Sequence, residues 1–120
     1  MRPTRSLALL TLLPLLAQAA DVTGTWTATF DTAVGKQEYT YELKAEGTQL
    51  TGRAKSANGD VAIESGTIAG DKISFVEKLS FQGNQLTITY NGTMIGANEI
   101  QFKREIAGFG VEELVAKRAN

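Results

Sequence analysis

Two stretches of the chain repeat one pattern and restrict how its second half can fold. GTIAGDKISF, residues 66–75, and GTMIGANEIQF, residues 92–102, both read Gly-Thr, an apolar residue, a second Gly, a polar turn and an apolar-x-Phe ending. A strand, a tight glycine turn and a returning strand account for each copy. The repeat therefore predicts two related β-hairpins lying side by side.

The alternation of apolar and polar residues extends this interpretation to the rest of the chain. From Val22 onward the dominant period is two, and helical spacing is not sustained over ten residues. The pattern predicts strands over residues 24–30, 37–45, 49–56, 60–69, 72–80, 85–95, 99–106 and 109–118. The fourth of these, residues 60–69, changes parity between Ile63 and Ile68, which predicts a β-bulge near Ser65-Gly66.

The last of these segments is ambiguous, and the expected architecture decides it. VEELVAKRA, residues 111–119, could form a short helix on propensity alone. Eight antiparallel strands in sequence order would leave two exposed edges in an open sheet, whereas closure removes both. We therefore expect an all-β chain, an eight-stranded antiparallel up-and-down meander barrel of lipocalin-like form, with an open β-sandwich as the alternative.

The amino-terminal residues predict a secretory signal peptide. Arg2 and Arg5 precede an apolar run over residues 7–17, and AQA at 17–19 supplies small residues for cleavage near Ala19. The run is too short to span a bilayer. We expect residues 1–19 to be removed and residues 20–120 to form a single domain, exported to the periplasm or the extracellular space, with no membrane span in the mature form.

Composition argues against several functions. Removing Arg2 and Arg5 lowers the 12 basic residues to 10, against 13 acidic residues, so the mature chain carries a net charge of −3. The charges are scattered singly, so nucleic acid is not an expected partner. The chain has no histidine and no cysteine, which excludes Ser-His and Cys-His nucleophile pairs and the usual zinc ligand sets. No cofactor is predicted.

One pair of carboxylates could correspond to the catalytic pair of a glycoside hydrolase. Glu64 and Glu77 could in principle perform glycoside hydrolysis if both faced inward on adjacent strands. We expect instead that Glu64 points outward and that Glu77 lies solvated near a barrel mouth, because carboxylates are rarely buried without partners. The sequence therefore predicts a protein that is not an enzyme.

Gly24-Thr25-Trp26 opens the first predicted strand and resembles the start of lipocalin and avidin type barrels. The resemblance implies that Trp26 closes one end of a barrel and that Arg118, near the last strand, stacks on its indole. The chain is shorter than a lipocalin, without a carboxy-terminal helix, and lacks the tryptophans that line the biotin site of avidins. Its L-x-G and G-x-I-x-G patterns also look like small secreted bacterial β-barrels of unknown function, which implies a fold and an address but no activity.

Six aromatic residues are predicted to face the interior, where they either form a packed core or contact a ligand. They are Trp26, Tyr39, Tyr41, Phe75, Tyr90 and Phe102. We favour a core, and with it a structural or interaction module that binds an envelope or extracellular protein or polymer through its outer surface, such as the Thr25, Thr27 and Thr29 row. The alternative is a barrel that binds a small apolar or sugar-like ligand.

Overall fold

The chain folds into nine antiparallel strands that form one sheet. The computed structural model describes residues 21–119, and within this range it contains no helix, so none is long and apolar enough to cross a membrane. The predicted all-β class is confirmed. The strands are β1 Gly24–Thr32, β2 Gly35–Glu46, β3 Gln49–Ser56, β4 Gly59–Ala62, β5 Glu64–Ala69, β6 Lys72–Phe81, β7 Asn84–Ile95, β8 Glu99–Ile106 and β9 Gly110–Arg118.

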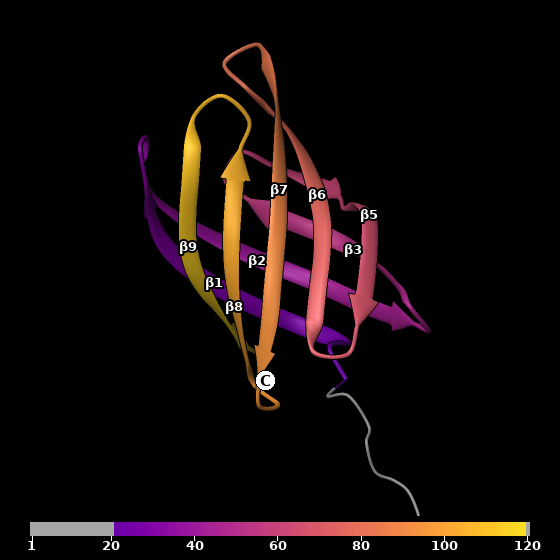
Figure 1. Cartoon of the computed structure of the whole chain (residues 1–120). Coiled ribbons are helices and arrows are strands. Elements are labelled where there is room, and N and C mark those ends of the chain that lie inside the picture. The colour runs from indigo at the N-terminus through magenta and orange to yellow at the C-terminus, as the bar shows by residue number, and fades with distance from the viewer. Residues whose placement is uncertain (1–20, 120) are drawn as a thin grey trace, which may run out of the picture.

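The sheet closes on itself, which confirms the barrel and not the open sandwich. Neighbouring strands follow the order β2-β1-β9-β8-β7-β6-β5-β3-β4, and a further pairing joins β2 to β3. The first strand pairs with the last through Trp26↔Arg118 and Thr27↔Lys117. In Figure 1, β5 to β9 form the front wall, and β1 to β3 cross behind it. The closed wall removes the exposed edges of an open meander.

The fourth predicted strand is interrupted at Ile63 and forms β4 and β5, and the predicted bulge lies within β5. Ser65 has a φ of 55°, and the β5–β6 register shifts between Glu64 and Thr67. β4 pairs with β3 through residues 59–62, whereas β5 pairs mainly with β6. One predicted strand therefore pairs with two neighbours on either side of this interruption, and the barrel has eight strands in the wall with one extra short strand.

Both copies of the repeat form hairpins, β5–β6 and β7–β8, as predicted. The second glycine of each copy, Gly70 and Gly96, lies in the turn with φ of 63° and 66°. The first glycine of the second copy, Gly92, faces inward beneath Phe102, and a Cβ there would lie 2.6 Å from that ring. The repeated glycines thus meet two requirements, a left-handed turn and a close approach to a core side chain.

The two ends of the barrel differ in what closes them. The Trp26 end is the closed end, where β1 begins and β9 finishes. The opposite end, the mouth, is ringed by the turns at residues 33–34, 57–58, 82–83 and 107–109. Between the ends, alternate residues of every long strand point inward and form one core. The predicted signal peptide lies outside the described residues.

Candidate functional site

The six aromatics expected inside the barrel are all buried there. Ring centroids of Phe75 and Tyr90 lie 4.5 Å apart, and those of Tyr39 and Tyr41 lie 5.2 Å apart. Phe102 packs edge-on against Tyr90 at 5.4 Å. The rings fill the middle of the barrel by contacting one another, as aromatic side chains in a packed core do. Their role as ligand contacts stays a prediction.

Trp26 closes one end together with Arg118, as the resemblance implies. The Arg118 guanidinium carbon lies 4.4 Å from the indole centroid, and Trp26 Nε1 donates to the Val22 carbonyl at 2.9 Å. Arg118 also donates to the carbonyls of Ala97, Thr23 and Asp21 at 2.7–3.0 Å. These bonds tie the chain that precedes β1 to the last strand, so this end is occupied by the protein itself.

The prediction for Glu77 is wrong, because its side chain is fully buried and not solvated at the mouth. The hydroxyls of Tyr39 and Tyr90 each donate to a different oxygen of its carboxylate, both at 2.8 Å. Buried carboxylates persist where hydrogen bonds and a counter-charge replace water, and sequence reasoning had not supplied these partners.

Glu64 lies where it was expected, exposed on the outer face, with its carboxylate 3.6 Å from Lys78 Nζ. Glu77 points to the opposite side of the same sheet. Two carboxylates that perform glycoside hydrolysis must flank one bond from a shared cleft. Glu64 and Glu77 are separated by the wall of the barrel, so they do not form such a pair.

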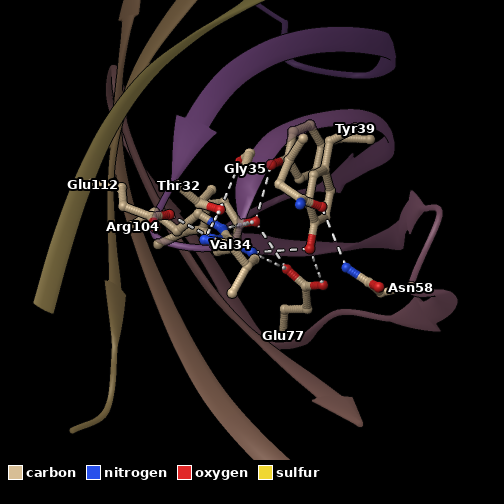
Figure 2. A network of polar contacts seen from close by, with 11 residues as sticks. Thr32, Val34, Gly35, Tyr39, Asn58, Glu77, Arg104 and Glu112 are labelled. Carbon is tan, nitrogen blue, oxygen red and sulfur yellow. Dashed lines mark hydrogen bonds and ion pairs between the residues drawn. The ribbon is translucent and has the colours of Figure 1, made fainter. Parts of the chain in front are cut away.

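Arg104 supplies the counter-charge and is the central residue that sequence reasoning missed. Figure 2 shows its guanidinium between Glu112 on one side and Tyr39 and Glu77 on the other. Its Nε donates to Tyr90 Oη at 2.8 Å, Nη2 donates to Tyr39 Oη at 2.9 Å, and Nη1 donates to Glu112 Oε1 at 2.6 Å. Two tyrosine hydroxyls therefore bridge a buried arginine and a buried carboxylate.

The signal for Arg104 was present in the parity of its strand. Phe102 was predicted to face inward on β8, and Arg104 has the same parity. An inward Glu77 on β6 and an inward Arg104 on β8 carry opposite charges. Read together, the two strands predict a buried pair, whereas each charge read alone suggests a solvated position.

Burial sets the proton affinities of this network. It raises the pKa of the Glu77 carboxyl, an effect opposed by the hydrogen bonds from Tyr39 and Tyr90 and by the charge of Arg104. Burial, followed by the negative charge of Glu77, raises the pKa of Tyr39 to about 12. Burial likewise holds the pKa of Tyr41 and of Tyr90 well above the ordinary value. Both hydroxyls that reach Glu77 donate, which suits an ionised carboxylate that accepts on each oxygen.

A hollow of about 360 Å³ opens at the mouth and reaches this network. Arg104 and Glu112 border it, beside polar groups such as Asp31 and Asn58. Most of the remaining lining is apolar: Val34, Leu79, Phe81, Leu86, Ile88, Ile106, Phe109 and Val111. None of the six predicted aromatics lines this hollow. The mouth is therefore a separate candidate site, built from strand ends and turns that the sequence had not singled out.

Comparisons with known proteins identify no relative of this chain. No family model matches the chain, and neither a curated protein nor a solved structure matches it significantly. Within residues 21–119, no group of three or more acidic side chains is arranged to hold a metal ion. The closed antiparallel barrel, with tryptophan and arginine stacked at one end, agrees in fold with the resemblance to lipocalin and avidin type barrels.

Proposed function

We propose that the protein is an exported, non-catalytic binding module that holds a small apolar ligand at the barrel mouth. The observation that carries the proposal is the mouth hollow, whose volume of about 360 Å³ suits a small molecule and whose walls are mainly apolar. Sites for small ligands typically measure about 300–1,000 Å³ and combine apolar walls with a few polar groups. Export is the part of the proposal that rests on residues 1–19.

The exposed apolar side chains of the molecule gather at the same place. Of the five large hydrophobic residues that are exposed among the described residues, three border the mouth hollow: Val34, Phe109 and Val111, with exposed fractions of 61%, 69% and 60%. A contiguous exposed apolar patch is characteristic of a binding surface, whereas single exposed apolar residues are ordinary. The cluster thus supports binding at the mouth.

The charges around the hollow favour a neutral or cationic ligand over an anionic one. Asp31 and Glu112 border it against the single positive charge of Arg104. Arg104 directs three donors into the protein, and its bond to Glu112 engages Oε1. Among the described residues no hydrogen bond engages Glu112 Oε2, which leaves an acceptor for a ligand donor group.

Titration with a neutral apolar dye, N-phenyl-1-naphthylamine, tests the proposal by its fluorescence increase on binding. Phe109→Ser should weaken dye binding about tenfold, because a partly buried aromatic contact contributes about 1.5 kcal/mol. The matched control is Val115→Ser, which also removes an exposed apolar side chain but lies outside the mouth. Equal loss in both variants, or unchanged binding by Phe109→Ser, would contradict a ligand site at the mouth.

A further inference from the structure

The outer face of the barrel carries a second hollow that shares no residue with the mouth. An open groove of about 1140 Å³ extends over the outward side chains of β5 to β9 and onto β1. Only Trp26 and Thr27 of β1 are in register with β9, so the two strands separate toward the mouth, and Thr29 of β1 borders the groove beside that gap. The groove therefore crosses six strands of the wall.

Two polar rows run across the groove from strand to strand. In the first row, Lys103 on β8 lies beside Asn91 on β7, and Asn91 lies beside Ser74 on β6. In the second row, Gln101 on β8 lies beside Thr93 on β7, which in turn lies beside Lys72 on β6. The rows present hydroxyls, amides and ammonium groups from the same side of the sheet, because the side chains of a strand alternate between faces.

The lysines of the groove differ from every other described lysine. Lys72, Lys103 and Lys117 line it, and none of them has a carboxylate partner within 4.0 Å among residues 21–119. The lysines elsewhere in that range each form an ion pair with an acidic side chain: Lys36 with Asp31, Lys44 with Glu46, Lys55 with Glu42 and Lys78 with Glu64. The unpaired positive charges of the barrel surface are thus concentrated in one place.

This concentration makes the groove basic on an acidic chain. Three lysines against the single acidic lining residue, Glu113, give the groove a net charge of +2, whereas the whole chain has a net charge of −1. Scattered charges along the sequence did not reveal this, because the three lysines come from β6, β8 and β9 and meet only when the sheet folds. Positive potential in a concave surface attracts anions.

We propose that the groove binds a linear acidic polysaccharide. Lys117 on β9 and Lys72 on β6 are three strand spacings apart, about 14 Å, so one small anion cannot reach both. An extended chain that carries a carboxylate on successive sugars can reach both and can also bond to the hydroxyl and amide rows. Phe30 and Phe102, the aromatic residues of the lining, are 7% and 2% exposed, so the groove offers no open ring on which nucleic-acid bases could stack.

Fluorescence anisotropy of a labelled oligouronate, long enough to span six strands at about 24 Å, tests the assignment. The triple variant Lys72→Gln, Lys103→Gln, Lys117→Gln should bind at least about tenfold more weakly than the native chain at low salt. The matched control is Lys36→Gln, Lys44→Gln, Lys55→Gln, which changes the net charge equally on β2 and β3, outside the groove. Its affinity should change less than about twofold, and added salt should weaken native binding.

Four results would overturn the proposal. They are no binding of the oligouronate by the native chain, equal loss in the two triple variants, binding of monomeric glucuronate as tight as that of the oligomer, and tighter binding of an oligothymidylate of equal charge. Circular dichroism of both triple variants should match the native spectrum, because exposed lysine ion pairs contribute little to stability. Dye binding at the mouth should be unchanged in both, so failure here is distinguishable from failure of the mouth site.

Discussion

At the scale of single residues, the barrel keeps one acid and one base inside its core. Glu77 and Arg104 are 0% and 3% exposed, and the hydroxyls of Tyr39 and Tyr90 lie between them. Removing one member of a buried charged network leaves its partner uncompensated, which costs more than the pair itself contributes. Each of the four side chains is therefore required by the other three.

The tyrosines of this core make a prediction about alkaline pH. The chain has three tyrosines, all buried, and burial raises the pKa of each, that of Tyr39 to about 12. A tyrosine in the unfolded chain has its ordinary pKa and loses its proton near pH 10. Above that pH the folded chain binds more protons than the unfolded chain, so stability should fall as pH rises from about 10 through 12.

Ultraviolet absorbance of phenolate, recorded with circular dichroism, measures this. We expect phenolate to appear only together with cooperative loss of strand structure. A reversible phenolate signal with a midpoint near pH 10, while the dichroism stays native, would show that a tyrosine is accessible and would contradict the buried network.

The sequence predicted only in part which side chains are buried and where the candidate site lies. The inward parity of Trp26, Tyr39 and Tyr41 followed from alternation, because a strand with one buried face fixes every second side chain. The burial of Glu77 did not follow from its own strand alone, since it depends on Arg104 and on two hydroxyls from other strands. The mouth hollow depends on where several turns meet, which no local pattern encodes.

At the scale of elements, the period-two alternation was sufficient to predict where the strands lie. The turn residues between them were sufficient to predict that consecutive strands pair. The segment that could have been a helix is β9, because pairing with both β8 and β1 favours an extended chain over intrinsic propensity. Asn58-Gly59 is a dipeptide that favours the two central positions of a hairpin turn, yet the β3–β4 turn lies one residue earlier. Ser56 pairs with Gly59, which leaves residues 57–58 in the turn. The register between the strands thus decides the position of this turn against dipeptide preference.

The β7–β8 hairpin makes a prediction about Gly92. Gly92→Ala would place a methyl group 2.6 Å from the Phe102 ring, and overpacking of this kind costs about 1–3 kcal/mol. Urea denaturation should show this loss. In the double variant with Phe102→Leu the combined loss should be smaller than the sum of the two single losses, because the smaller side chain relieves the clash. Strict additivity would contradict the close approach.

At the scale of the whole molecule, the closure of the barrel is uneven. β6 and β7 share ten register pairs, whereas β1 and β9 share two, at Trp26 and Thr27. Local opening begins in the parts of a structure that have the fewest backbone hydrogen bonds. The seam between β1 and β9 is therefore expected to open early, together with the β3–β5 pairing, which also has two register pairs.

Hydrogen exchange followed by mass spectrometry tests this. Peptides from residues 110–116 of β9 should exchange faster than peptides from the middle of β7, which has a paired strand on each side throughout. Equal protection of the two strands would mean that the seam is as stable as the interior pairings. Faster exchange would show that the groove beside Thr29 borders a mobile edge.

Asp21 and Ala119, the first and last described residues, both lie at the end closed by Trp26, joined through Arg118 and the bond from Ala119 N to the Thr25 carbonyl (Figure 1). The mouth lies at the other end of every long strand. A fusion partner or a surface anchor joined directly to Asp21 or to Ala119 would attach at the closed end and leave the mouth facing away from it. Immobilisation through either attachment point would therefore expose the same end of the barrel, the mouth, to solution.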